Sequence, residues 1–389
     1  MNWRRYQLRK EAVGVALRHP WIFRDHLSSA ASVFRDGERL RLFDGHNRIV
    51  GYGLYEATGA IAIRMLRRGD AAPDAAWLRG QLAAAVNRRS QLATHTDAIR
   101  LVHGESDGLP ALVVDRFADT LVVSSYAAGS DGLARFAARA LATGATGREI
   151  IGPAHHVVLR PARLRQATTE AARTVRGTPP GLVTIHEHGL ALAVDLEAGQ
   201  KTGTYLDLRG LRREVAAASL TGARVLNLFA YSGMLGRAAE AAGATTIVQV
   251  DASARALELA RAHHVVDLAR HQLIVADVFD WLPSYAPDAP FDLVIVDPPS
   301  MTSKATQVPG VLAAYRKLYR AAAQLVRPGG RLVAACCTSR IERAVFHKTV
   351  GDALGADFSR DREIPPEPDH PVSFPQADYL KIAWWNRAG

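Results

Sequence analysis

Cysteine is almost absent from this chain of 389 residues, which contains only Cys336 and Cys337, next to each other. Adjacent cysteines rarely bridge, because a disulfide needs alpha carbons about 4.4 Å or more apart and specific side-chain directions. Two cysteines are also too few for a disulfide framework or a structural zinc site. Two interpretations therefore stay open, a small apolar filler in a buried strand and a nucleophile.

Long hydrophobic runs are also missing. No uninterrupted apolar stretch approaches the roughly 18 residues that a membrane-spanning helix needs. The N-terminal region is basic but has no continuous apolar segment and no small-residue cleavage site, so no secretory signal is predicted. Together with the scarcity of cysteine, this favours a protein of the reducing cytoplasm with no membrane partner. The adjacent histidine pairs lack metal-ligand spacing, so no metal site is predicted.

Acidic residues are outnumbered, with 38 Asp and Glu against 48 Lys and Arg, giving a formal net charge of +10. A basic balance favours a polyanionic partner such as nucleic acid, although an arginine-rich proteome would produce the same excess. The basic residues near the N-terminus are candidate phosphate contacts or, equally, a solvated basic tail. They are Arg4, Arg5, Arg9 and Lys10.

The length and the patterning predict three domains. Residues 1–70 alternate apolar and polar positions around the turn "DGHN", which is typical of a small β-rich domain. Residues 71–185 combine helical periods with strand-like runs, the last of them at 149–159 and 181–196, and predict a central α+β subdomain. A third domain is expected at 186–389.

The third domain alternates strands and helices, which predicts an α/β fold with a doubly wound parallel sheet. Expected strands lie at 223–231, 245–251, 271–277, 290–300 and 329–337, and expected helices lie at 233–243, 252–268 and 310–326.

Acidic residues stand at three successive strand ends of this sheet, Asp251, Asp277 and Asp297. Ligands bind at the carboxyl ends of the strands in such folds. Asp251 follows Gly233 at the spacing of an acid that accepts ribose hydroxyls, and Asp277 could accept an adenine amino group. Each acid alone is more often a helix cap or turn residue, but the three in order favour a nucleoside cofactor.

The loop "FAYSGMLG" after the first strand is not a GxGxxG motif, so a pyrophosphate is a poor candidate. Ser232 and Gly233 are expected to let the backbone approach a ligand closely. A nucleoside without phosphate suggests S-adenosylmethionine. The predicted contacts at these strand ends are Phe229, Tyr231, Ser232, Gly233, Asp251, Ala252, Asp277, Val278, Asp297 and Pro298.

These residues resemble a known family. "NLFAYSG", "VQVD", "VADVF", "VDPPS" and the cysteine after "GGRLVAAC" resemble class I methyltransferases that make 5-methylcytosine in large-subunit ribosomal RNA. The nearest family is that of ribosomal RNA large subunit methyltransferase I, and the resemblance runs nearly end to end. "RHPWIF" is similar to its N-terminal PUA domain, "HGESDGLPALVVDRF" to its central subdomain, and "DHPV" and "DYLKIAWW" to its C-terminal end.

The resemblance implies a Rossmann-like catalytic domain, S-adenosylmethionine as cofactor, 23S ribosomal RNA as partner, and a homodimer. It implies further cofactor contacts in "GQKTGTYLD", at Gln200, Lys201, Thr202, Gly203 and Tyr205. Only one cysteine can face the crevice because side chains alternate along a strand. Matching the motif makes Cys337 the nucleophile and Cys336 a packing residue, with Asp297 hydrogen-bonding the base as charge builds.

One departure from the family bears on the base. Relatives often have an aromatic residue or lysine after DPP, where this chain has Ser300 and Met301. Two alternatives stay open. A methyltransferase acting on an exocyclic nitrogen would suit an aromatic residue there better than serine. A non-catalytic RNA-binding assembly factor would not need three intact acids and the motif cysteine.

Overall fold

The structure is a computed structural model that describes residues 2–28, 31, 33–144, 152, 154–162, 172–197, 199–302 and 304–389. The chain divides into two compact units. The first comprises Met1–Glu187, Val194–Leu206 and Pro368–Phe374, and the second His188–Ala193, Asp207–Glu367 and Pro375–Gly389. Among the described residues, no helix has the length and apolar character needed to cross a membrane.

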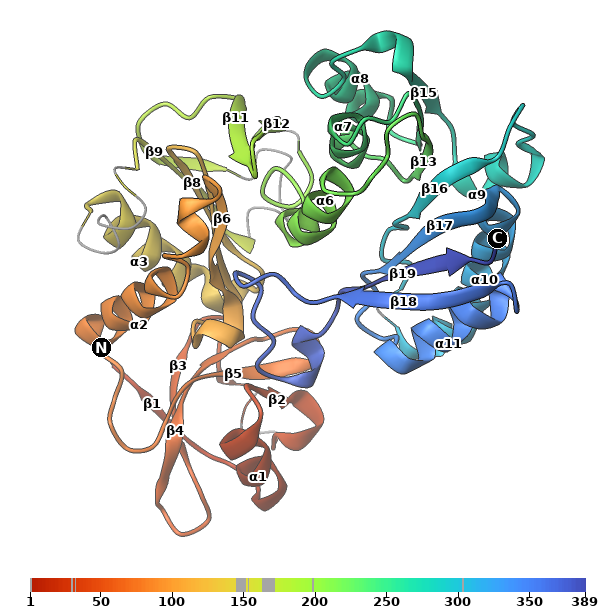
Figure 1. The fold of residues 1–389 in the computed structure, drawn as a ribbon. Coiled ribbons are helices and arrows are strands. Elements are labelled where there is room, and N and C mark those ends of the chain that lie inside the picture. The colour runs from red at the N-terminus through yellow and green to blue at the C-terminus, as the bar shows by residue number, and fades with distance from the viewer. Residues whose placement is uncertain are drawn as a thin grey trace. The chain divides into compact units, whose positions relative to one another are not determined.

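The first sheet of the first unit has five strands in the order β1-β3-β4-β5-β2 (Figure 1). They are β1 (Arg4–Gln7), β2 (Trp21–Phe23), β3 (Arg39–Phe43), β4 (Ile49–Tyr55) and β5 (Ile61–Arg68). The predicted "DGHN" turn joins β3 to β4, and Asp44 there accepts hydrogen bonds from the N–H groups of His46 and Arg48. Helix α1 (Lys10–Arg18) adds Ala12 and Ala16 to a core around this sheet.

The second sheet of this unit has the order β10-β9-β8-β7-β6. It consists of β6 (Ala98–His103), β7 (Leu112–Phe117), β8 (Thr120–Ser125), β9 (His156–Arg160) and β10 (Arg173–Arg176). Helices α2 (Ala75–Asn87) and α3 (Asp131–Ala142) pack on it with their own apolar core. The strand expected at 149–159 begins outside the described residues, and its described end falls within β9.

A segment far along the chain, Pro368–Phe374, also belongs to the first unit. Asp369 is fully buried; its Oδ2 accepts a hydrogen bond from the Arg100 N–H at 2.9 Å, and Arg89 donates to its carbonyl at 3.1 Å. The conspicuous "DHPV" stretch is therefore held by the central sheet of this unit. The hairpin of β11 (Leu182–Glu187) and β12 (Leu190–Asp195) forms a separate two-stranded sheet.

The second unit contains a seven-stranded sheet in the order β15-β14-β13-β16-β17-β19-β18. Its strands are β13 (Arg224–Leu228), β14 (Thr246–Asp251), β15 (His271–Val275), β16 (Phe291–Val296), β17 (Val326–Cys336), β18 (Phe358–Ile364) and β19 (Lys381–Arg387). The first five are parallel, whereas β19 is antiparallel to both β17 and β18. The central strands are almost continuously apolar, as expected of strands covered on both faces.

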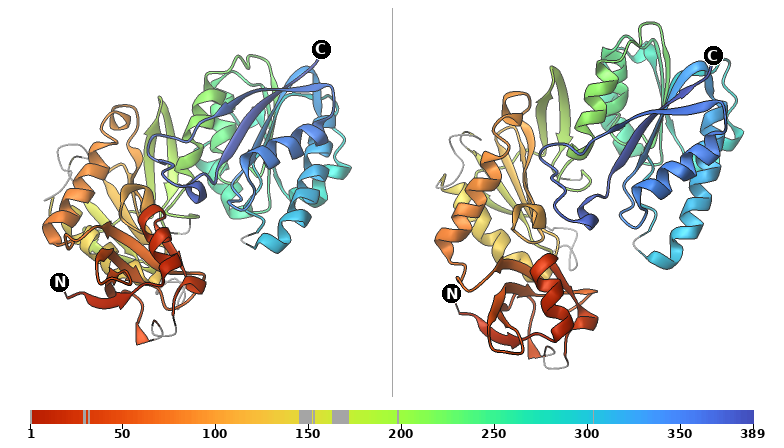
Figure 2. Two further views of the ribbon diagram at one scale, coloured as in Figure 1. Left: turned by 90° about the horizontal axis from the view of Figure 1, so that it is seen from below. Right: turned by 60° about the horizontal axis from the view of Figure 1, so that its bottom comes forward.

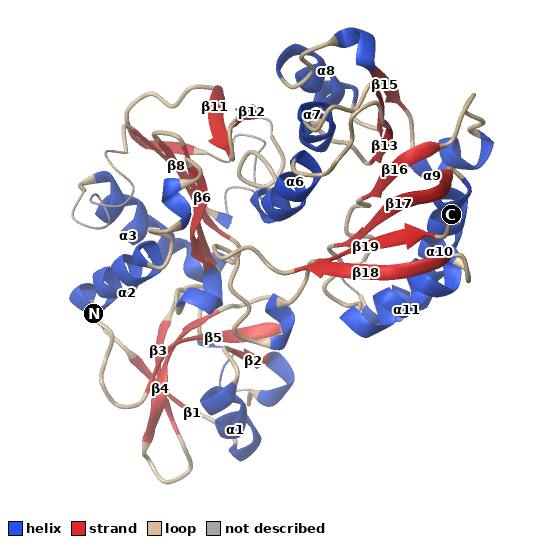
Figure 3. Ribbon diagram, in the orientation of Figure 1, coloured by secondary structure: helices blue, strands red, loops and turns tan. Residues whose placement is uncertain are grey.

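Helices cover both faces of this sheet (Figures 2 and 3). They are α6 (Arg209–Ala216), α7 (Met234–Ala241), α8 (Ala254–His263), α9 (Val278–Trp281), α10 (Val308–Gln324) and α11 (Arg343–Leu354). Alternate strand residues such as Leu226, Val294 and Ala334 join one core with α10 and α11. The intervening Asn227 and Gln249 are hydrogen-bonded to each other on the other face, and α7 packs closely on Gln249 there.

The predicted α/β fold is confirmed, including all five expected parallel strands and the three expected helices. The β18–β19 hairpin was not predicted. The domain boundaries at 70 and 186 stay a proposal. The separate cores of residues 6–65 and 66–159 support the first of them, whereas Val194–Leu206 and Pro368–Phe374, beyond the second, belong to the first unit.

Candidate active site

The candidate site lies where the carboxyl ends of five parallel strands share one edge of the sheet. Strand order runs outward from β13 through β14 to β15 on one side, and through β16 to β17 on the other. The crevice of an open α/β sheet forms at such a switch point, outside the ends of β13 and β16. The loops that follow these strands carry most of the predicted site residues.

The loop after β13 has an unusual backbone. Phe229 and Tyr231 have positive φ angles of 59° and 48°, and Gly233 has a φ of 73°. Positive φ costs a residue with a side chain on the order of 1–3 kcal/mol, and such residues gather at ligand sites. Backbone hydrogen bonds from Ala230 to Val250 and from Gly233 to Ala230, at 3.0 and 2.8 Å, hold this shape.

The small residues of this loop serve the protein's own packing. Ser232 is 2% exposed. A Cβ on Gly233 would lie 2.8 Å from the Cβ of Ala260, and one on Gly236 would lie 2.2 Å from Gln249 Oε1. The small residues therefore allow α8 and Gln249 to pack closely here, and close approach of a ligand to this loop stays a prediction.

Asp251 ties this loop to the end of β14. Its Oδ2 accepts a hydrogen bond from the Tyr231 N–H at 2.7 Å, and its Oδ1 accepts one from the Ser253 N–H at 2.8 Å. A carboxylate has about four acceptor positions, so two stay available for hydroxyl donors. Ala252 beside it is exposed.

Asp277 caps the short helix α9, since its Oδ1 accepts a hydrogen bond from the Phe279 N–H at 2.8 Å. The side chain is exposed, and Val278 next to it is buried. The ring of Phe279 lies 5.4 Å from that of Phe229, centroid to centroid. Asp277 therefore has the helix-cap role that the sequence left open, beside a small aromatic wall.

The two cysteines occupy different environments. Cys336, the last residue of β17, is fully buried in the core with α10, and the Tyr315 hydroxyl lies 3.6 Å from its sulfur. Cys337 is half-buried, and its Sγ lies 3.8 Å from the carbonyl oxygen of Pro298. Because β16 and β17 are parallel neighbours, Cys337 lies beside the loop that begins with the half-buried Asp297.

Thr338 links the cysteine turn to this proline-containing loop. Its Oγ1 accepts a hydrogen bond from the Met301 N–H at 3.4 Å and lies 3.3 Å from the Tyr315 hydroxyl. Burial is the main cause of a raised pKa for Tyr315, with Cys336 next, so the phenol stays protonated. Ser300 is exposed, while Met301 packs on the core.

Lys381 is a buried cation behind the cysteine pair. It is fully buried on β19, opposite Cys336, and its Nζ donates to the carbonyls of Thr338 and Ile341 at 2.9 Å each. Burial lowers its pKa, whereas the facing Cys336 acts to raise it. The buried amino group therefore lies behind the turn that carries Cys337.

Comparison with known proteins identifies the family. Residues 100–381 match S-adenosylmethionine-dependent methyltransferases, and residues 8–68 match the PUA-like domain. A ribosomal RNA large subunit methyltransferase of Deinococcus radiodurans is 34% identical over 391 residues, covering 94% of this chain and 93% of that protein. The chain belongs to the ribosomal RNA large subunit methyltransferase I family. It is an S-adenosylmethionine-dependent methyltransferase.

Other relatives of this methyltransferase agree. The ribosomal RNA large subunit methyltransferase I of Salmonella arizonae is 32% identical over 377 residues, covering 94% of this chain and 92% of its own. A Streptococcus mutans protein described as a SAM-dependent methyltransferase has the same fold, with a TM-score of 0.83, 21% identity, and coverage of 98% and 100%. A protein described as a methyltransferase complexed with SAH has a TM-score of 0.84 at 21% identity, again covering 98% and 100%.

S-adenosylmethionine fits the carboxyl edge of this sheet on chemical grounds. Asp251 keeps acceptor positions suited to ribose hydroxyls. The exposed Asp277 offers a carboxylate beside the Phe229–Phe279 wall, as an adenine requires. No phosphate-binding loop is needed for this nucleoside, which agrees with the loop after β13.

The turn "GQKTG" belongs to the first unit of the methyltransferase, whereas the contacts above belong to the second. Thr202 is buried, and its hydroxyl donates to Asp115 Oδ2 at 2.5 Å. Lys201 has a φ of 55° and its Nζ lies 4.2 Å from the centroid of the Tyr205 ring. The Tyr205 hydroxyl donates to Gln200, and the Gly203 N–H donates to the Gln200 carbonyl at 2.9 Å. A cofactor role for these five residues stays a prediction.

The sequence analysis did not identify two residues that lie near the site. Lys381 could have been noticed as a charge at the start of the apolar run "IAWW". His264 had no such signal, since its pair "HH" has no metal spacing. In the structure its Nδ1 bonds the Ser232 carbonyl and its Nε2 lies 2.9 Å from the Ala193 N–H nitrogen. Burial lowers its pKa, which leaves it neutral and able to hold the loop after β13.

The basic N-terminal residues are only partly available to a ligand. Arg4 forms an ion pair with Glu38 at 2.5 Å, and Arg5 donates to Asn47 and lies 4.0 Å from the centroid of the Phe43 ring. Arg9 and Lys10 are exposed. Phosphate binding by these four residues stays a prediction.

Proposed function

We propose that this methyltransferase makes 5-methylcytosine in large-subunit (23S) ribosomal RNA through a covalent adduct on Cys337. The observation that carries the proposal is the contrast between the two cysteines. Cys336 is fully buried in the core, whereas Cys337 is half-buried with its sulfur beside the loop of Asp297 and Pro298. A packing role accounts for Cys336, whereas the half-buried Cys337 is the candidate nucleophile.

The chemistry needs a nucleophile because carbon 5 of cytosine is too weak to take a methyl group directly. The Cys337 thiolate adds to carbon 6, forming an S–C bond and placing electron density on carbon 5. Bound S-adenosylmethionine would supply the methyl group that carbon 5 takes up, with S-adenosylhomocysteine as the other product. A proton then passes from carbon 5 to water, the S–C bond breaks, and the thiolate is regenerated.

Four other residues support this sequence of steps. Asp297 accepts a hydrogen bond from the protonated ring nitrogen or amino group of the base as positive charge develops there. Lys381 presents a positive charge to the two sulfur atoms, as its electrostatic coupling to Cys336 and Cys337 indicates. Pro298 and Pro299 stiffen the loop that carries Asp297.

Ribosomal RNA as the substrate is supported by the names of the relatives, which span nearly the whole chain. The PUA-like domain at residues 8–68 and the net charge of +10 fit an RNA partner. The target base must leave its helix stack to reach a half-buried sulfur, so unpaired or locally melted RNA is the expected substrate. We also propose a cytoplasmic location, and a homodimer that light scattering would detect.

The test is incubation with isotope-labelled S-adenosylmethionine and under-modified 23S RNA, followed by nucleoside digestion, mass analysis and mapping of the base. Label in 5-methylcytosine supports the proposal. Label on an exocyclic nitrogen of adenine or guanine overturns the cytosine chemistry. No transfer to RNA, together with no cofactor binding by calorimetry, would favour the assembly factor.

A further inference from the structure

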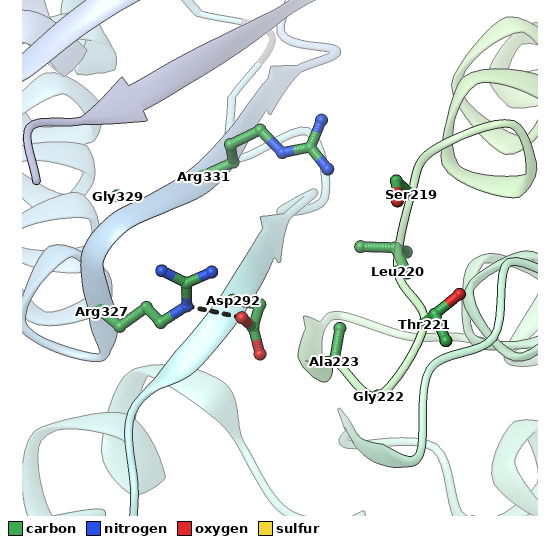
Figure 4. Close-up of a pocket in the computed structure, with 9 residues that line it drawn as sticks. All are labelled: Ser219, Leu220, Thr221, Gly222, Ala223, Asp292, Arg327, Gly329 and Arg331. Carbon is green, nitrogen blue, oxygen red and sulfur yellow. Dashed lines mark hydrogen bonds and ion pairs between the residues drawn. The ribbon is translucent and has the colours of Figure 1, made fainter.

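A pocket of about 290 Å³ lies at the opposite end of the catalytic sheet, at the amino ends of its strands (Figure 4). The residues that line it come from the loop before β13 and from the first residues of β16 and β17. They are Ser219, Leu220, Thr221, Gly222, Ala223, Asp292, Arg327, Gly329 and Arg331. None of them belongs to the cofactor or cysteine site described above.

Arg331 is the charge of this pocket that no residue of the pocket lining pairs with. Figure 4 shows its guanidinium extended toward the loop at Ser219. It forms no hydrogen bond or ion pair with a described residue, and stacks on Trp384 at 5.0 Å from the ring centroid. Arg362 approaches the same fully buried ring at 5.1 Å. Burial and the charge of Arg362 lower the pKa of Arg331, and the charge of Asp361 acts against them, so an anion in the pocket would stabilise the guanidinium further.

The other charged residues of the pocket compensate one another. Arg327 Nε lies 2.5 Å from Asp292 Oδ1, and Asp292 Oδ2 accepts a hydrogen bond from the Arg224 N–H at 2.7 Å. Burial acts to raise the pKa of Asp292, but these hydrogen bonds outweigh it and keep the carboxylate charged. The pocket thus carries one net positive charge from Arg331, together with the hydroxyl of Ser219, whereas the Thr221 hydroxyl points away from Arg331 (Figure 4).

We propose that this pocket binds a phosphate group, and that the phosphate belongs to the backbone of the RNA substrate. The guanidinium is planar and is held over the Trp384 ring, and its donors have the fork geometry that phosphate oxygens accept. The phosphate chemistry rests on the pocket alone, whereas its assignment to RNA rests on the proposed function.

The position of Arg331 on β17 indicates the role of such a phosphate contact. Cys337 follows the end of this strand, six residues beyond Arg331. At about 3.3 Å per residue they are roughly 20 Å apart, so Arg331 holds a phosphate well away from the target base. Contacts of this kind fix the position of the RNA without reading its sequence.

The test compares Arg331→Gln with Arg331→Lys and with Arg316→Gln, which removes the same charge from an exposed position on α10. RNA affinity is measured across a range of salt concentrations, alongside thermal melting. We expect Arg331→Gln to weaken RNA binding about tenfold at low salt. We also expect it to reduce the salt slope by about one. Arg331→Lys should keep most of the slope, and Arg316→Gln should leave both quantities unchanged.

Methylation kinetics separate this proposal from the proposed function. Arg331→Gln should raise KM for RNA and leave kcat unchanged at saturating RNA. If the wild type methylates RNA while a folded Arg331→Gln keeps wild-type affinity, slope and KM, the RNA assignment is overturned and the function stands. If the wild type transfers no methyl group to RNA, the proposed function fails.

Calorimetry with inorganic phosphate tests the other source of the ligand. Saturable binding to the wild type that is lost in Arg331→Gln, with RNA binding unchanged, would assign the pocket to a free phosphate compound. If neither RNA nor inorganic phosphate responds to the substitution, the pocket binds no phosphate and the inference is wrong.

Discussion

The adjacent cysteines allow one prediction to be worked out in detail, because substituting each to alanine should have opposite consequences. Cys337→Ala removes the proposed nucleophile. Loss of a covalent nucleophile from other enzymes lowers kcat by about 10⁴- to 10⁶-fold, and we expect a loss in this range. Cys337 is half-buried and lies outside the core cluster, so the free energy of unfolding should fall by less than about 1 kcal/mol.

Cys336→Ala is the matched control. Its sulfur is fully buried, lies in the core with α10 and is 3.6 Å from the Tyr315 hydroxyl. Truncation leaves a small cavity and removes a weak acceptor, which should cost about 1–2 kcal/mol of stability. Turnover should stay within about threefold of wild type wherever the protein is folded, because no step uses this sulfur.

The assay is transfer of labelled methyl to 23S RNA at saturating cofactor, with cofactor binding by calorimetry and unfolding by denaturant. Cys337→Ala should bind the cofactor normally. A folded Cys337→Ala that retains wild-type turnover would refute the nucleophile. The reasoning would be refuted equally if a folded Cys336→Ala were inactive while Cys337→Ala stayed active.

Four further substitutions concern the surroundings of the site and the two units. Lys381→Met removes the charge facing the cysteines, so the midpoint of the acid limb of the kcat/KM profile should move to higher pH; an unchanged profile would exclude an electrostatic role. Gly236→Ala places a Cβ 2.2 Å from Gln249 Oε1 and should destabilise by about 1–3 kcal/mol. Gly80→Ala, in open space within α2, should stabilise by about 0.5–1 kcal/mol in the same denaturant titration. Burial, followed by the charges of His370, Arg100 and Arg89, lowers the pKa of His103 to about 2. The unfolded chain takes up a proton at His103 below about pH 6.5, whereas the folded protein does not. The free energy of unfolding should therefore fall as the pH is lowered. His103→Gln should reduce the loss of unfolding free energy between pH 6.5 and 5.5 by about 1 kcal/mol. An identical loss in the variant and the wild type would contradict the lowered pKa of His103.

The parallel half of the catalytic sheet could be predicted because its signal is local. Each strand is a short apolar run, three of the runs end at or just before an aspartate, and amphipathic helices separate most of them. The β18–β19 hairpin was missed for a physical reason. Strand β18, "FSRDREI", is largely exposed at the sheet edge and its composition is typical of a loop, so only pairing with β19 defines it.

The sequence predicted where the acids of the candidate site lie in the sheet, but not what they contact. The acids fall after their strands as expected, yet Asp277 caps α9, and Gly233 makes room for Ala260 and Gln249. Lys381 was missed because its partners are backbone carbonyls some 40 residues away in the chain, which carry no sequence signal. Contacts such as Arg100 to Asp369, 269 residues apart, are likewise decided only by the tertiary fold.

Trapping with RNA that carries 5-fluorocytosine at the methylated position tests the central claim most directly. Fluorine on carbon 5 cannot leave as a proton, so the S–C bond to carbon 6 should persist after methyl transfer. Proteolysis and mass analysis should find a denaturation-resistant RNA adduct on Cys337, absent from Cys337→Ala. An adduct on Cys336, or methylation of the fluorinated base without any adduct, would contradict the account.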